Sequence, residues 1–212
     1  MTELVTDRDL HYDLIVIGGG VSGLWLLNHF SQLGYSIALF EKDELGSQQT
    51  IASQGMIHGG VKYALSGALN KSSEAIGDMP PLWKKCTQGL GPVNLNKTKI
   101  LSDEFYLWST HSLASRLTSF FASKALRGRV EKIGAKQRPT VFQNSMFSGN
   151  IYRLIDMVLD VPSLVINLAE NYRPNIFKID WNQAELNTDD QGAVSLKLGN
   201  STLRAQRFLF TA

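Results

Sequence analysis

Three glycines with the spacing G-x-G-x-x-G, Gly18, Gly20 and Gly23, directly follow a short apolar run. In such a motif the first glycine lets the chain turn out of a strand, the second lets the backbone approach a phosphate, and the third lets a helix pack on a sheet. The N–H groups and the positive dipole of the first helical turn suit a diphosphate. The spacing therefore predicts a strand–turn–helix unit that binds a dinucleotide pyrophosphate, with Val21 and Ser22 in the same site.

An acidic residue stands where such a unit needs one. Glu41 follows the glycines at about 20 residues, the distance at which a carboxylate accepts hydrogen bonds from an adenosine ribose. The same carboxylate disfavours a 2′-phosphate, so NADP is the least favoured dinucleotide. Lys42 comes next in the chain and is assigned to the site as well. The alternative interpretation is a plain βαβ unit with an acid on its surface.

The apolar pattern indicates the elements that must position these residues. Residues 12–17 are apolar and β-branched, as in a buried strand, and residues 24–33 have the apolar spacing of a packed helix. Gly34 is expected to end that helix, and residues 37–40 form the next predicted buried strand. Glu41 would then lie at the carboxyl end of this second strand.

A glycine-punctuated segment of small and polar residues, 46–63, follows where a simple nicotinamide-binding domain would continue into another helix and strand. Such a segment can place backbone donors along an extended cofactor. Its second half, SQGMIHGGVKY from Ser53 to Tyr63, resembles a loop of the D-amino-acid-oxidase-like superfamily of FAD-dependent oxidoreductases. That superfamily includes glycine and sarcosine oxidases, FAD-linked glycerol-3-phosphate dehydrogenases and L-2-hydroxyglutarate dehydrogenases.

The resemblance implies FAD as the cofactor, because the glycerophosphate and hydroxyglutarate branches both place this loop beside the pyrophosphate, the ribityl chain and the flavin ring. Gln54 departs from the serine that both branches tend to have at this position, which leaves the branch open. The loop residues that the resemblance assigns to the cofactor site are Gln49, Thr50, Ser53, Gln54, Gly55, Met56 and His58.

Composition limits the classes of function. The chain has 212 residues, 43% of them hydrophobic, which is enough to bury one substantial core or two sub-domains. A net charge of +2 without a basic block argues against nucleic acid as a partner. The single cysteine, Cys86, excludes an internal disulfide, and the histidines do not cluster with carboxylates at metal-ligand spacing.

The N-terminus is polar and acidic, which fits neither a secretory signal nor a transit peptide. No apolar run approaches the roughly 18 residues that a transmembrane helix needs. We therefore expect a soluble, cytoplasmic protein without a transmembrane segment, and peripheral membrane association stays open.

The expected fold class is α/β, a Rossmann-like FAD/NAD(P)-binding domain with an inserted, incomplete α+β substrate domain. The resemblance implies that residues 10–89 and 161–212 form the two parts of the FAD-binding domain and that residues 90–160 belong to the substrate domain. Residues 99–102 and 104–109 are predicted to pair as a hairpin in a second sheet. The other predicted elements are helices over residues 82–87, 113–126 and 161–169, and strands over residues 176–181, 193–198 and 207–211.

The last predicted strand ends at Ala212 without a cap or a polar tail. We therefore expect the chain to be the N-terminal part of a protein nearly twice as long, with the second part of the FAD-binding domain truncated.

Several residues outside the glycine motif are candidates for chemistry. His58 can serve as a base or as a donor to the flavin ring, or simply as a loop histidine that bonds its neighbours. Arg153 can clamp a carboxylate. Lys62 and Tyr63 suit an anionic group or a solvated surface pair, and Tyr106 and Trp108 suit a pocket wall or, preferably, core packing. No residue is assigned as catalytic.

The glycine motif together with the family resemblance implies an FAD-dependent oxidoreductase that passes a hydride from a CH–OH or CH–NH group of a small, anionic substrate to the flavin. The electron acceptor, oxygen or a quinone, stays open. The alternatives are an NAD-binding module and a catalytically inactive flavin-binding module.

Replacing Glu41 with alanine should weaken FAD retention by about 1–3 kcal/mol, the free energy of a lost charged hydrogen bond. A flavin-fluorescence titration measures the dissociation constant. Unchanged retention would show that this carboxylate does not hold the ribose.

Overall fold

The computed structural model describes residues 9–61, 76–109, 130–190 and 192–211. The chain divides into two compact units. The first unit comprises residues 1–54, 88–98 and 161–212, and the second comprises residues 55–87 and 99–160. This division places residues 55–87 with the inserted segment rather than with residues 10–54. Which unit binds cofactor and which binds substrate stays a prediction.

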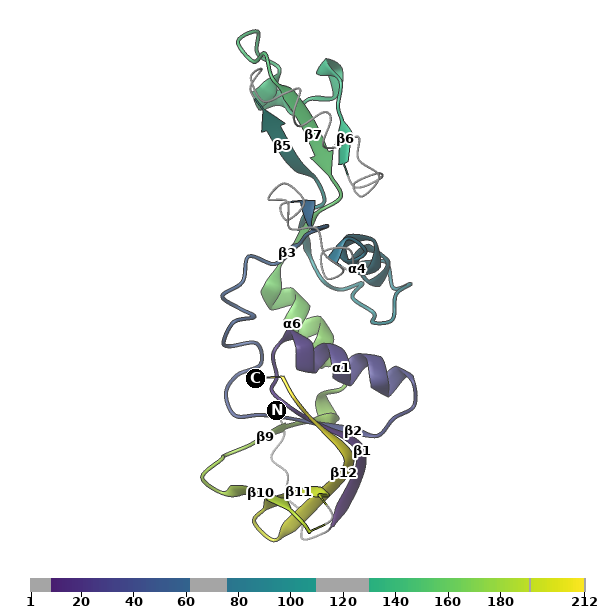
Figure 1. Ribbon diagram of the computed structural model, residues 1–212, viewed down its shortest axis with the longest axis vertical. Helices are drawn as coiled ribbons and strands as arrows, with labels where there is room; N and C mark the ends of the chain where they lie inside the picture. The colour runs from purple at the N-terminus through teal and green to yellow at the C-terminus, as the bar shows by residue number, and fades with distance from the viewer. Residues whose placement is uncertain (1–8, 62–75, 110–129, 191, 212) are drawn as a thin grey trace. The chain divides into compact units, whose positions relative to one another are not determined.

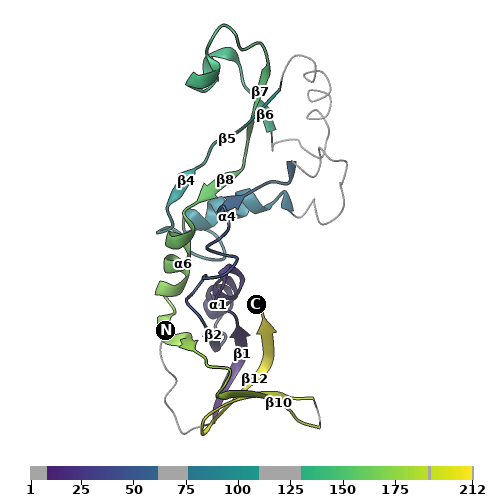
Figure 2. The same cartoon turned by 90° about the vertical axis from the view of Figure 1, so that its left-hand side faces the viewer.

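A six-stranded sheet organises the first unit, in the order β10-β11-β12-β1-β2-β9. Strands β12 (Ser201–Phe210), β1 (Leu10–Ile17), β2 (Ile37–Glu41) and β9 (Ile176–Lys178) are parallel, as the register of each pair shows. Figure 2 shows β12, in yellow, beside β1. Strands β10 (Ala184–Thr188) and β11 (Val194–Leu198) extend the sheet as an antiparallel meander onto β12. The α/β, Rossmann-like fold class is thereby confirmed.

Helix α1 (Val21–Gln32) connects β1 to β2 and contacts helix α6 (Val161–Glu170), which precedes β9 in the chain (Figure 1). A short 3-10 turn, η4 (Arg173–Asn175), separates α6 from β9. The contact between the two helices contains a buried amide, since Asn28 Nδ2 donates to the carbonyl oxygens of Leu24 at 2.9 Å and Leu168 at 2.6 Å. Asn28 therefore ties α1 to α6 through directed bonds.

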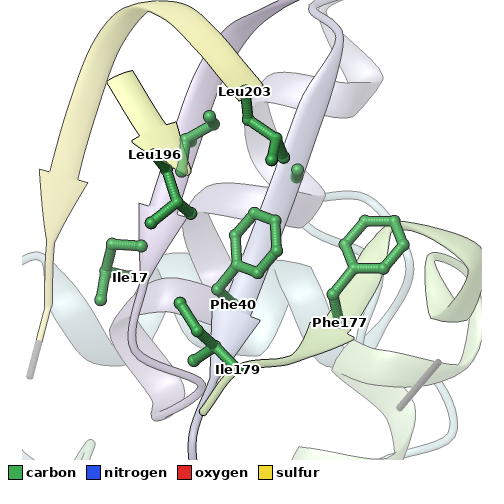
Figure 3. Packing of buried hydrophobic residues seen from close by; sticks show 8 residues of the cluster. Ile17, Phe40, Phe177, Ile179, Leu196 and Leu203 are labelled. Carbon is green, nitrogen blue, oxygen red and sulfur yellow. The ribbon is translucent and has the colours of Figure 1, made fainter. Parts of the chain in front are cut away.

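One apolar cluster gathers side chains from the parallel strands and from the meander (Figure 3). Phe40 of β2 and Phe177 of β9 stack with ring centroids 5.4 Å apart. The members of the cluster are Ile15, Ile17, Ala38, Phe40, Phe177, Ile179, Leu196 and Leu203. Near-continuous apolar runs are typical of parallel strands that are covered on both faces, which is why residues 12–17 and 37–40 could be recognised as strands.

The described residues of the second unit form two three-stranded sheets with the orders β3-β8-β4 and β5-β7-β6. The first consists of β3 (Met56–Ile57), β4 (Ile100–Ser102) and β8 (Met157–Leu159). The second consists of β5 (Phe105–Ser109), β6 (Val130–Lys132) and β7 (Asn150–Leu154). Two 3-10 turns, η2 (Ala135–Gln137) and η3 (Thr140–Phe142), lie between β6 and β7.

The predicted hairpin between residues 99–102 and 104–109 is wrong. Strand β4 pairs with β8 and strand β5 pairs with β7, both antiparallel. The registers show that β4 and β5 run in one direction, antiparallel to β8 and then to β7, with an irregularity between Ile100 and Ser102. Only Asp103 separated the two predicted strands; in the structure Asp103 and Glu104 both lie between β4 and β5, at a break in a long ribbon.

Other predicted elements agree with the structure. Helix α4 (Met79–Thr87) contains Pro80 and Pro81 in its first turn, where no N–H donor is needed. Helix α6 and strands β9 and β11 form where helical or strand patterns predicted them, whereas β10 was missed and β12 begins earlier than expected. The predicted helix 113–126 lies outside the described residues. Among the helices that the structure describes, none combines the length and apolar character needed to cross a membrane.

The turn between β1 and α1 depends on close packing at Gly23. A Cβ atom at this position would lie 1.9 Å from the Gly18 carbonyl oxygen and 3.0 Å from Thr211 Oγ1. Thr211 in turn donates to the carbonyl oxygens of Ile17 at 3.2 Å and Gly18 at 3.1 Å, directly after β12. The third glycine of the motif therefore allows the helix to lie directly against the end of β1.

Replacing Gly23 with alanine should lower the free energy of unfolding by about 3 kcal/mol, because the new methyl group meets backbone that cannot yield. Urea denaturation measures the change. The control is Gly134→Ala, at which a Cβ would meet nothing within 4 Å. Equal unfolding free energies for the two variants would contradict the close-packing argument.

Candidate functional site

The N-terminus of α1 directly follows the glycine turn, and its N-cap residue supplies no side-chain cap. Gly18 adopts a φ of 113°, which favours glycine, and its N–H donates to the Phe40 carbonyl oxygen at 2.8 Å. Gly20 is the N-cap residue; it makes no side-chain bond to the helix, and the first turn contains no acidic residue. The start of α1 thus presents the positive end of the helix dipole without an acidic residue of its own first turn beside it.

Glu41 lies beside this turn, as its sequence spacing predicted. Its Oε2 accepts the Gly19 N–H at 2.6 Å and its Oε1 accepts the Asp43 N–H at 2.8 Å. A carboxylate oxygen has two lone pairs, so each oxygen retains capacity for a further donor such as a ribose hydroxyl. Glu41 therefore shapes the turn in the protein itself, in addition to any bond that it makes to a ligand.

Thr50 also comes to the helix N-terminus from the loop after β2. Its Oγ1 accepts the Val21 N–H at 3.0 Å and lies 3.2 Å from the point where a Cβ at Gly20 would be. The loop is anchored nearby, because the Gly46 N–H donates to the Gly19 carbonyl oxygen at 2.9 Å. With its oxygen accepting from Val21, the Thr50 hydroxyl can still donate its proton to an anion.

The structure thus brings together the glycine turn, Glu41 and Thr50 in the first unit. The other predicted residues of this unit are solvent-exposed, and Lys42 forms a loose ion pair with Asp43 at 3.8 Å. Their roles toward a cofactor stay predictions. They are Ser22, Lys42, Gln49, Ser53 and Gln54.

The remaining loop candidates, Gly55, Met56 and His58, belong to the second unit. Met56 lies in β3, which pairs antiparallel with β8, and the Gly55 carbonyl oxygen accepts the Leu159 N–H at 2.9 Å. His58 is half-buried and directly follows this short strand. Lys62 and Tyr63 lie outside the described residues.

Two residues that the sequence analysis did not single out form hydrogen bonds with Glu41 and with the loop of residues 55–60. Gly19 donates to Glu41, and a Cβ on it would come within 2.6 Å of Leu45 Cδ2. Asp156 accepts the Gly59 N–H at 2.8 Å. The run of three glycines at 18–20 was a signal for the first residue, and a carboxylate within the apolar sequence LIDMVL was a signal for the second.

Two further candidates for chemistry, Arg153 of β7 and Tyr106 of β5, have partners in the protein. Arg153 Nη2 lies 2.7 Å from Glu131 Oε2, and this hydrogen bond and the charge of Glu131 raise the pKa of Arg153. The Tyr106 hydroxyl donates to Glu104 Oε2 at 2.8 Å. Arg153 is thus paired with Glu131. To bind a substrate carboxylate as predicted, Arg153 would have to exchange this ion pair for one with the substrate.

Trp108 does not pack into a core, contrary to the preferred interpretation. It is 53% exposed and lies beside Phe142 and Phe147, with ring centroids 6.2 and 6.4 Å away. Alternation along a strand distinguishes two faces of a sheet, but it does not establish that another layer covers either of them.

The donor set of the first unit fits FAD. A helix N-terminus without an acidic residue in its first turn suits a pyrophosphate, and the glycine at position 20 leaves no Cβ at the N-cap. The Glu41 carboxylate at the end of β2 suits a ribose diol. This chemistry is common to dinucleotides that have an unphosphorylated ribose.

Comparison with known proteins distinguishes among those dinucleotides. Residues 13–176 match the family model DAO, described as FAD dependent oxidoreductase. A probable FAD-dependent oxidoreductase of Pseudomonas aeruginosa, PA4991, is 41% identical over 203 residues, which are 96% of this chain and 51% of that protein. A glycerol-3-phosphate dehydrogenase of Pseudomonas tolaasii is 44% identical over 52 residues, 24% of this chain and 10% of that protein.

Solved structures agree with this assignment. The crystal structure of PA4991 covers 96% of this chain and 48% of its own, with a TM-score of 0.72 and 31% identity over the structural superposition, against 41% in the sequence alignment. Glycine oxidase from Geobacillus kaustophilus, at 18% identity and a TM-score of 0.61, covers 96% of this chain and 55% of its own and shares the fold. The chain spans about half the length of its Pseudomonas aeruginosa relative. On the family match and this relative, the chain belongs to the DAO family of FAD-dependent oxidoreductases.

Proposed function

We propose that the intact protein oxidises a CH–OH or CH–NH group of a small, anionic substrate. The observation that carries the cofactor part of this proposal is the convergence of the Gly18–Gly23 turn, Glu41 and Thr50 at one helix N-terminus. The similar proteins named above include a glycerol-3-phosphate dehydrogenase and a glycine oxidase, which act on an alcohol and an amine. Both of those substrates are small and carry a negative group, and this supports the same class here.

The α1 N-terminus, Thr50 and Glu41 have distinct proposed roles. The α1 N-terminus and the Thr50 hydroxyl bind the pyrophosphate, and Glu41 binds the ribose while it keeps the Gly19 turn in place. Bound FAD supplies the electron-accepting chemistry. Residues 55–60 are proposed to lie toward the flavin, where backbone N–H groups can stabilise negative charge.

Anaerobic mixing of the yellow, FAD-loaded protein with candidate substrates tests the proposed reaction. We expect bleaching of the flavin by one member of a panel of 2-hydroxy acids, amino acids and glycerol 3-phosphate. A yellow protein that no member bleaches would favour the inactive flavin-binding module, and a colourless protein that binds NAD would favour the nicotinamide alternative.

Replacing Thr50 with valine should weaken FAD binding by about 0.5–1.5 kcal/mol, because the isosteric side chain keeps the packing and loses the hydroxyl. Serine at this position retains the hydroxyl and should preserve most of the affinity. Isothermal titration with FAD measures both changes.

The matched control is Thr87→Val. The Thr87 hydroxyl donates to the Lys84 carbonyl oxygen at 2.9 Å at the end of α4. If both threonine-to-valine changes altered affinity equally, the proposed contact of Thr50 with the pyrophosphate would be excluded.

A further inference from the structure

Asp156 is a carboxylate in an unusual place in the second unit. It lies at the break between β7 and β8, flanked by Ile155 and Met157, and only 5% of it is exposed. A buried charge without partners is costly, because water no longer solvates it. A neutral residue would fill this position at lower cost, so the carboxylate calls for an explanation beyond packing.

The contacts of Asp156 connect it to the loop after β3. In the antiparallel ladder, Met56 pairs with Val158 and Ile57 pairs with Met157, so the next position along β3 is His58 opposite Asp156. Asp156 Oδ1 accepts the Gly59 N–H at 2.8 Å. Gly59 is itself buried. The carboxylate thus holds the peptide group that joins His58 to Gly59.

Little else in the described ranges compensates this carboxylate. Gly59 N–H is the one hydrogen-bond donor to Asp156 there, and His58 is the one titratable side chain that acts on it. Burial raises the pKa of Asp156, while the Gly59 bond and the charge of His58 oppose that rise. Both compensating groups therefore come from the same two-residue segment.

We propose that Asp156 is a positioning residue: its carboxylate anchors the His58–Gly59 peptide so that the loop of residues 55–60 is ordered for the cofactor before binding. The inference rests on the proposed function, because that function orients residues 55–60 toward the flavin. A loop that is already anchored loses little conformational entropy when the cofactor binds, and this pre-organisation raises the affinity for the cofactor. Asp156 acts through the backbone of the loop and makes no contact of its own with the reacting atoms.

Two substitutions of Asp156 separate its hydrogen bond from its charge. Asp156→Asn keeps an acceptor oxygen at nearly the same place and removes the charge, whereas Asp156→Ala removes the acceptor. The matched control is Asp103→Asn, an exposed aspartate at the corresponding break between β4 and β5. Should the alanine variant fail to fold, Asp156→Ser is the second variant, because its hydroxyl oxygen lies one bond nearer the backbone than Oδ1 and so no longer occupies the acceptor position.

Hydrogen exchange of residues 55–60 and the FAD dissociation constant are measured on the full protein. We expect Asp156→Ala to accelerate exchange and to weaken FAD binding by about tenfold, the effect of one lost hydrogen bond to a charged group. Asp156→Asn should restore FAD binding to within about threefold of the wild type, as Asp103→Asn should.

A purely structural role would give a different result. If Asp156→Ala accelerated exchange and left the FAD dissociation constant unchanged, or if Asp156→Asn bound FAD as weakly as Asp156→Ala, the positioning role would be overturned. If the wild type and Asp103→Asn bound no FAD, the proposed function would fail and this inference with it, and the exchange data would still report whether the Gly59 bond exists.

The melting temperature adds a pH test of the burial of Asp156. Because the pKa of Asp156 is raised on folding, the folded protein binds this proton more tightly than the unfolded chain does. The ionised carboxylate therefore destabilises the folded protein at any pH above the pKa of Asp156 in the folded state. This destabilisation disappears as the pH falls toward the pKa of an aspartate in the unfolded chain, about 3.9. Asp156→Asn should therefore melt above the wild type at neutral pH, with the difference shrinking in acid. A pH-independent difference would contradict the buried, ionised carboxylate.

Discussion

The close approach of α1 to the end of β1 is the constraint on which the first unit depends. Gly23 leaves no room for a Cβ against the Gly18 carbonyl oxygen, and Thr211 bonds that same oxygen from the end of β12. The helix N-terminus is therefore held at the carboxyl edge of the parallel strands. Strand ends and helix dipole converge there, which is the general reason why open α/β sheets bind anions at this edge.

Polar side chains also hold the turn between β1 and α1, whose geometry apolar packing alone would not determine. Glu41 bonds the N–H groups of Gly19 and Asp43, and Thr50 bonds the first N–H of α1. Within the helix pair, Asn28 joins α1 to α6, although its buried Oδ1 has no hydrogen-bond partner among the described residues. Directed bonds of this kind select one geometry among the many that hydrophobic contact permits.

The second unit differs from the first in that its strands are short and its sheets are small. The β4–β5 and β7–β8 segments form one interrupted ribbon, and the interruption carries Asp156 on one side and Asp103 on the other. One aspartate is buried against Gly59 and the other is exposed. The same residue type at the same break thus has opposite environments: the apolar neighbours of Asp156 indicate burial, but they do not reveal its partner Gly59.

The amino-acid sequence by itself determined the features that depend on neighbouring residues. The glycine spacing, the apolar runs of β1 and β2 and the distance to Glu41 were sufficient to predict the strand–turn–helix unit, its carboxylate and the α/β class, and the loop motif identified the family. These signals are local, because a turn or a buried strand restricts residue types within a few positions.

Only the tertiary structure decided which distant segments meet. Thr50 reaches Val21 across 29 positions, and Asp156 reaches Gly59 across 97. The pairing of β4 with β8 instead of β5, and the exposure of Trp108, likewise depend on which strand or layer lies next to each segment. Such contacts leave little trace in a single sequence, because a hydroxyl or a carboxylate has the same local propensity whether its partner is water or a buried N–H group.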